Sequence, residues 1–135
     1  MNPGRKLDFG TPVYVVDDDA AMRKWLGDAL AEGGLTCKTY ATGDSFLAEL
    51  DQLAPGCLLL DMRMPQLSGI EVQTEIVRRR HAMKVIVVTG TSNVETVLEA
   101  MKLGALDVLE KPFTTEALLN AVRAALVAID SEGAR

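Results

Sequence analysis

The sequence has little of what marks secreted, membrane-bound or nucleic-acid-binding proteins. Its two cysteines, Cys37 and Cys57, fall in predicted strands, which favours buried thiols in a reducing compartment over a disulfide or a metal site. No apolar run approaches the roughly 18 residues of a membrane span, and Met1–Pro12 lacks the hydrophobic centre of a signal peptide. We therefore expect a cytoplasmic chain without a membrane partner.

Basic residues and histidine are also scarce. The 14 Lys and Arg are outnumbered by 19 Asp and Glu, for a formal net charge of −5. This balance argues against a nucleic-acid-binding surface within the segment, because phosphate contacts need clustered basic residues. The only histidine, His81, follows three arginines at the end of a predicted helix, where positive charge complements the helix C-terminus. The 135 residues suffice for one domain with its own core.

What the sequence does contain is a set of short apolar runs that end in polar residues. Runs of four or five branched apolar residues indicate strands buried on both faces, which pair in parallel between covering helices. The carboxyl ends of such strands share one edge of the sheet, so we expect the polar residues to converge where ligands bind in open α/β folds. The runs are Val13–Val16 before Asp17 and Asp18, Cys57–Leu60 before Asp61, Val85–Val88 before Thr89, and Leu106–Leu109 before Glu110 and Lys111.

Helical patterns separate these strands and one further predicted strand, Leu35–Tyr40. Each helix is indicated by apolar residues three to four apart and by a capping residue or a Gly or Pro stop. Five strands alternating with five helices predict a doubly wound α/β fold in three layers. The predicted helices are Ala20–Glu32, a short helix that Thr42 opens and Pro55-Gly56 ends, one starting at the capping box Ser68–Glu71, one starting at the capping box Ser92–Glu95 and ending at Gly104, and one capped by Thr114 or Thr115 that runs through Ile129.

Three aspartates at the expected sheet edge form a candidate metal site. Asp17, Asp18 and Asp61 offer hard oxygen ligands, and their charges would repel one another without a cation. Mg²⁺ is the natural candidate, because it takes one or two carboxylates, keeps several waters and completes its shell with phosphate oxygen. Mn²⁺ is expected as a substitute.

The same residues also have ordinary structural interpretations. Asp18 or Asp19 could cap the first helix. Asp61 could be the acid of a turn, Thr89 could hydrogen-bond its own loop, and Lys111 could be a solvated surface charge. Helix capping, however, explains too little of the whole set.

Four motifs follow one another at these strand ends. They are Asp17-Asp18, the run D-M-R-M-P from Asp61, V-V-T-G ending at Thr89-Gly90, and E-K-P-F at Glu110–Phe113. Together they resemble the receiver domains of two-component response regulators, the CheY-like superfamily, and most closely its FixJ-like branch. The resemblance spans about residues 12–129 and implies a flavodoxin-like five-stranded parallel sheet, in the strand order 2-1-3-4-5, flanked by five helices.

The resemblance also implies a phosphoacceptor. In this family the aspartate that matches Asp61 takes a phosphoryl group from the phosphohistidine of a sensor histidine kinase, and Thr89 and Lys111 would hold phosphoryl oxygens. Such a chain assists its own phosphorylation and dephosphorylation but is not a turnover enzyme. At its reference pKa of about 3.9, Asp61 is expected to be ionised near pH 7, so no general base is needed.

The metal ligands and a backbone feature follow from the same resemblance. Asp18 and Asp61 would bind Mg²⁺ directly and Asp17 mainly through water, and the backbone carbonyl of Arg63 would complete the protein ligands. The bond between Lys111 and Pro112 would be a cis peptide.

Three positions are expected to modulate the site. Arg63 and Thr91 occupy the family's positions beside the path of the hydrolytic water and should tune dephosphorylation. Val108 stands where most relatives have Tyr or Phe, whose ring turns inward on phosphorylation. Valine has no ring to move between rotamers, so we expect the signal to run through Thr89, Thr91 and the fourth helix. The same departure keeps open a stand-alone phosphorelay or pseudo-receiver interaction module without a DNA-binding output.

Two other classes fit the sequence less well. A haloacid-dehalogenase-type phosphatase normally carries a second acid two residues after its nucleophile, where this chain has Arg63. A flavodoxin-like flavin carrier needs a Ser/Thr/Gly-rich phosphate loop after the first strand, whereas three consecutive aspartates, 17–19, would repel the phosphate.

We divide the chain into an N-terminal extension (1–11), a receiver domain (12–129) and a C-terminal tail or start of a linker (130–135). FixJ-like relatives commonly carry a helix-turn-helix domain after the receiver, so transcriptional control is expected of a longer parent protein, with DNA contacted only through an output domain absent from this segment. A homodimer on phosphorylation is expected through the fourth helix and fifth strand, which hold more apolar residues than the core needs: Val94, Val97, Leu98, Met101, Leu103 and Leu106.

Overall fold

The computed structural model describes residues 11–90 and 94–133 and contains one parallel sheet. Its strand order, β2-β1-β3-β4-β5, is the predicted one. All four neighbouring pairs are parallel, so the carboxyl ends of the strands meet at one edge. The strands are β1 (Val13–Val16), β2 (Cys37–Tyr40), β3 (Cys57–Asp61), β4 (Lys84–Thr89) and β5 (Asp107–Glu110).

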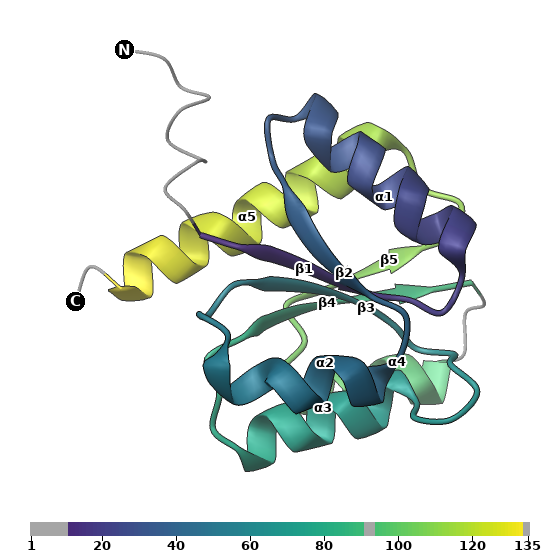
Figure 1. The fold of residues 1–135 in the computed structure, drawn as a ribbon, viewed down its shortest axis with the longest axis vertical. Coiled ribbons are helices and arrows are strands. Elements are labelled where there is room, and N and C mark those ends of the chain that lie inside the picture. Colours follow the sequence, from purple (N-terminus) through teal and green to yellow (C-terminus); the bar gives the residue numbers. More distant parts are fainter. Residues whose placement is uncertain (1–10, 91–93, 134–135) are drawn as a thin grey trace.

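Helices cover both faces of the sheet, as the doubly wound prediction requires. α1 and α5 lie on one face and α2, α3 and α4 on the other, which makes three layers (Figure 1). Among the described residues, every helix is too short or too polar to cross a bilayer. The helices are α1 (Ala20–Glu32), α2 (Gly43–Glu49), the short 3-10 helix η2 (Leu50–Gln52), α3 (Gly69–Arg78), α4 (Val94–Lys102) and α5 (Thr115–Gly133).

Each face of the sheet has its own apolar core. Val15 packs among the side chains of α1 and α5, whereas its neighbour Val16 packs among those of α2 and α3, because successive strand residues point to opposite faces. Both valines are fully buried, as are Leu30 in the first core and Phe46 in the second. The apolar runs in β1, β3 and β4 therefore reflect burial on both sides, as predicted. The prediction is wrong for Leu106–Leu109: β5 lies at the edge of the sheet, Leu106 is exposed, and of the residues in β5 only Leu109 is buried.

Several boundaries differ from the predicted ones. β3 includes Asp61 and β4 includes Thr89, because pairing continues through Asp61, which lies opposite Val88. β2 begins at Cys37 rather than Leu35, and α5 runs past Ile129 to Gly133.

Local caps set where the helices begin. Ser68 and Glu71 form the predicted capping box of α3. The Thr114 side chain accepts a hydrogen bond from the backbone N–H of Ala117, so Thr114 rather than Thr115 caps α5. The capping box expected at Ser92 lies outside the described residues, as do residues 1–10 of the predicted extension and residues 134–135 of the predicted tail.

Candidate functional site

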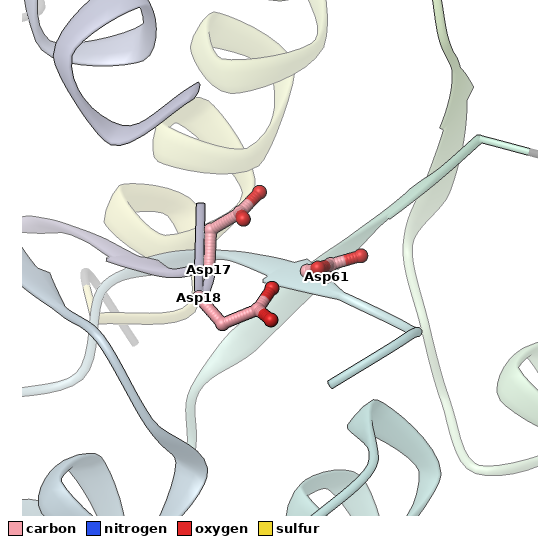
Figure 2. Close-up of side chains that lie close together, drawn as sticks. All are labelled: Asp17, Asp18 and Asp61. Carbon is pink, nitrogen blue, oxygen red and sulfur yellow. The ribbon is translucent and has the colours of Figure 1, made fainter. Parts of the chain in front are cut away.

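Three carboxylates converge at the carboxyl edge of the sheet. Asp17 and Asp18 follow β1, Asp61 ends the adjacent β3, and one oxygen from each lies within 4.8 Å of the others. Figure 2 shows the three side chains projecting from the ends of these two strands. Asp17 is 1% exposed and Asp61 6%, while Asp18 is exposed to solvent. The site therefore has a buried floor and one carboxylate at its open side.

The segment after β1 is held by hydrogen bonds around Asp17. Its N–H donates to the Tyr40 carbonyl (3.1 Å), and its Oδ1 accepts from the N–H of Asp19 (2.9 Å). Arg23, on α1, donates from Nη1 to the Asp17 carbonyl (2.7 Å). Asp19 itself caps α1 by accepting from the N–H of Ala21. The capping interpretation left open between Asp18 and Asp19 thus belongs to Asp19, and Asp18 faces the site.

The loop after β3 is held just as closely. Asp61 Oδ1 accepts from the backbone N–H of Arg63 (3.2 Å), and Met62 donates to the Val88 carbonyl (3.2 Å). The N–H of Gly69 donates to the Met62 carbonyl (3.2 Å). A Cβ at Gly69 would lie 2.6 Å from the backbone oxygen of Asp61, so only glycine lets α3 begin this close to the acid.

Lys111 and Thr89 complete the edge from the other side of β3. Lys111 donates its N–H to the Thr89 carbonyl (2.8 Å), and its Nζ lies 3.8 Å from Asp17 Oδ2. The Lys111-Pro112 peptide is cis. Thr89 is buried at the end of β4, opposite Glu110 of β5. The structure thus brings the acids, the threonine and the lysine to one edge.

Burial changes the acidity of both inner aspartates. It raises the pKa of Asp61 to about 6, with a smaller contribution from the charges of Asp17 and Asp18, against the lowering effects of the Arg63 N–H and Lys111. Burial likewise raises the pKa of Asp17. The expectation of an ordinary pKa for Asp61 is therefore wrong for the site without a metal. Burial destabilises the charged carboxylate more than the Arg63 N–H and Lys111 stabilise it.

The acidic cluster could hold a metal ion. Asp17 Oδ2 is buried and has no hydrogen-bond partner among the described residues. Three carboxylates face one lysine at this edge, so negative charge is in excess. A small oxygen-seeking divalent cation would relieve both the unpaired oxygen and the repulsion.

The structure describes two of the three residues that were predicted to modulate the site, Arg63 and Val108. Arg63 is exposed beside Asp61. Val108 is half-buried, pairs with Val87 and packs against the core under α2 and α3. Thr91 lies outside the described residues.

Sequence reasoning missed two supports of the site, Arg23 and Gly69. Arg23 looks like any other cation on a helix face, since its bond to the Asp17 carbonyl depends on how α1 leaves β1. Gly69 carries a clearer signal, because a glycine directly after a helix-capping serine suggests a close approach of backbones.

Comparisons with known proteins agree with this geometry. Residues 13–123 match the family described as response regulator receiver domain. The chain is 45% identical over 115 residues to the transcriptional regulatory protein FixJ of Azorhizobium caulinodans, covering 85% of this chain and 54% of that protein. It is 39% identical over 119 residues to the response regulator protein TmoT of Ectopseudomonas mendocina, covering 88% and 54%.

Solved structures give the same picture. The crystal structure of FixJ-N matches with a TM-score of 0.82 and 34% identity, over 86% of this chain and 93% of that one. A response regulator receiver protein from Pseudomonas putida matches with a TM-score of 0.78 and 32% identity, over 84% and 97%. The chain spans about half the length of the curated relatives it matches.

Proposed function

This chain belongs to the family of response regulator receiver domains, and from that premise we propose that Asp61 accepts a phosphoryl group from a sensor histidine kinase. A carboxylate oxygen of Asp61 would attack the phosphorus of a phosphohistidine. As the new P–O bond forms, the P–N bond breaks and its electron pair returns to the imidazole of the kinase. The transfer changes the conformation of the domain and is not a turnover reaction of this chain.

The observation that carries the proposal is the convergence of three carboxylates within 4.8 Å, with the Lys111 ammonium 3.8 Å from one of them. Charge on a transferring phosphoryl group spreads over three equatorial oxygens, so positioning and cationic groups supply most of the catalysis. Lys111, which follows β5, would hold one of these oxygens. The hydroxyl of Thr89, the last residue of β4, would hold another. Asp61 reacts in its ionised form, which a pKa of about 6 still leaves dominant at pH 7.

Mg²⁺ is the metal that this donor set fits, with Mn²⁺ as a substitute. Asp18 and Asp61 would bind it directly, Asp17 mainly through water, and the Arg63 carbonyl would complete the protein ligands. When bound, the ion neutralises charge on the carboxylates and on the phosphoryl oxygens. Arg63 and Thr91 would set the access of water to the acyl phosphate and so its lifetime.

The proposal is tested by phosphorylation with a small donor. Acetyl phosphate with Mg²⁺ should add one phosphoryl group to the wild type, measured by intact mass, and none to Asp61→Asn. Asp51→Asn, which changes an exposed aspartate at η2, is the matched control and should be labelled like the wild type. Labelling of Asp61→Asn at the wild-type rate would refute the assignment.

The proposal extends to control of transcription, since one relative carries the name of a transcriptional regulatory protein. DNA would be contacted only through an output domain outside this segment. The alternative, a stand-alone phosphorelay or interaction module, is favoured by one observation: Val108 offers no ring to report phosphorylation. The native reading frame discriminates between them, because roughly 70–90 further residues with a helix-turn-helix pattern would identify a transcription factor.

Phosphorylation should also promote self-association through α4 and β5. Four apolar side chains on this surface are well exposed: Val94 by 68%, Leu98 by 54%, Met101 by 44% and Leu106 by 43%. Phosphorylation would shift α4 through the loop after Thr89, with an effect on association on the order of 1–3 kcal/mol. Sedimentation with and without beryllofluoride, a phosphoryl mimic, should show a dimer only with the mimic. A monomer at high micromolar concentration in both states would refute this.

A further inference from the structure

One buried polar side chain lies outside the phosphorylation site and joins two helices. Gln73 is on the inner face of α3 and is 2% exposed. Its Nε2 donates a buried hydrogen bond to the Ala100 carbonyl of α4 (3.1 Å), while its Oε1 has no partner among the described residues. A carbonyl can only accept, so the amide group must turn its nitrogen toward Ala100.

The acceptor of this bond lies at the end of α4 that leads into β5. Ala100 is the fully buried residue of α4, and its carbonyl also accepts from the N–H of Ala105 (3.1 Å). A single oxygen therefore joins α3, the last turn of α4 and the turn before β5.

Moving the C-terminal end of α4 away from α3 would break a buried hydrogen bond and leave a second polar group of Gln73 unpaired, which is costly. The C-terminal end of α4 is therefore held to α3, and the same Ala100 carbonyl also holds the turn before β5.

We infer that Gln73 is a positioning residue that holds the C-terminal end of α4 and the turn before β5 in one unit with α3, so that a displacement caused by phosphorylation of Asp61 is carried to the start of β5. This inference rests on the proposed function and names the route by which the signal leaves the site. It accounts for a receiver with Val108 in β5, since the displacement reaches β5 through the backbone at Ala105 and requires no aromatic ring.

The test is amide hydrogen exchange on Gln73→Met, which keeps the length of the side chain and removes the donor. In the ligand-free protein the amides of Leu103, Gly104 and Ala105, whose acceptors lie in α4, should exchange about tenfold faster than in the wild type. Amides in β1 and β3 should be unchanged, whereas general destabilisation would speed exchange everywhere.

A second measurement tests whether ligand binding at Asp61 is coupled to β5 through Gln73. Beryllofluoride with Mg²⁺ should bind Gln73→Met with a Kd within about twofold of wild type, because the phosphorylation site is intact, but the change it causes in exchange across β5 should shrink about threefold or more. Thr74→Val is the matched control: it removes a side-chain bond to the Ile70 carbonyl on the exposed side of the same helix and should behave as wild type.

The outcomes separate the two proposals. Wild-type exchange at the end of α4 in Gln73→Met, or an undiminished response of β5, would overturn this role of Gln73. If Gln73→Met does not fold, Gln73→Leu takes its place with the same expectations. Failure of the wild type to bind beryllofluoride would instead contradict the proposed function, while the ligand-free exchange rates would still decide whether Gln73 holds α4.

Discussion

Asp61 and Glu75 are both acids near the ends of regular elements, yet their surroundings push their pKa values in opposite directions. Glu75, on the surface of α3, accepts hydrogen bonds from the Nε atoms of Arg78 (2.8 Å) and Arg79 (2.7 Å). These bonds lower its pKa to about 2. Asp61 is buried among other acids, and burial raises its pKa to about 6.

The contrast separates an acid that the chain itself neutralises from one that it leaves short of partners. Two arginines at the C-terminal end of α3 neutralise Glu75. Arg79 also donates from Nη1 to the Leu47 carbonyl (3.0 Å), which ties α3 to α2, and to Asp51 Oδ1 (3.4 Å). Asp61 and Asp17 share one lysine. A carboxylate whose partners are all supplied by the chain stabilises the fold, whereas a buried carboxylate short of partners is free to take a ligand.

The largest effect is expected on the Mg²⁺ affinity of the acidic cluster, when one of its carboxylates is removed. Asp18→Asn should weaken Mg²⁺ binding at least 30-fold, about 2 kcal/mol, because it would remove a carboxylate that we propose as a direct ligand, and should slow phosphorylation. Its fold should be intact or more stable, since repulsion falls. Calorimetry, or the fluorescence of Trp25, which contacts Phe113 beside Lys111, measures the affinity.

Lys111→Ala sharpens the same experiment. It should retain Mg²⁺ binding while impairing the coupling of phosphorylation to conformation, because the lysine is expected to contact phosphoryl oxygen rather than the ion. Asp28→Asn, an exposed change on α1, is the control. Equal Mg²⁺ affinity in Asp18→Asn and the wild type would contradict the ligand role.

The next effect is a pH dependence of stability in the metal-free protein. The pKa of Asp61 is about 6 in the folded protein, above its ordinary value, so the folded state binds this proton more tightly. The stability contributed by the protonated form is present below about pH 4 and is lost as the pH rises through 6.

Asp61→Asn should therefore gain stability relative to the wild type across that window. The gain should be on the order of 1 kcal/mol, allowing for the solvent at the open side of the site, and should level off above pH 7. Urea unfolding in EDTA at several pH values measures it. A constant difference between the two proteins from pH 4 to 7 would contradict the raised pKa.

The smallest effect on stability is expected from Glu75, whose carboxylate is paired with two arginines. Glu75→Gln should shift the urea midpoint less than Asp61→Asn at pH 7, because exposed ion pairs contribute little. Because the pKa of Glu75 is lowered, its effect on stability depends on pH in the opposite direction to that of Asp61. The stability that Glu75 contributes is present above its ordinary pKa and is lost as the pH falls toward 2. A larger destabilisation by Glu75→Gln at pH 3 than at pH 7 would refute this.

Much of the fold was open to prediction because its signals are local. The run Val13–Val16 is apolar at every position, which only a strand buried on both faces requires, and Ser68 and Glu71 satisfy helix amides three residues apart. The strand ends were predicted less well. Whether Asp61 ends β3 or follows it depends on Val88 of another strand, which lies opposite it.

The sequence by itself determined the order of strands and helices and the set of acids, threonine and lysine at the strand ends, because hydrophobic period and capping act over a few residues. Only the tertiary structure decided which aspartate caps α1, how far burial raises the pKa of Asp61, and that Gln73 of α3 reaches the carbonyl of Ala100. The cap is a local contact, but Asp18 and Asp19 have identical side chains, so the sequence left it open. The pKa of Asp61 and the bond of Gln73 depend on groups far apart in the chain, whose distance and desolvation exist only once the layers have packed.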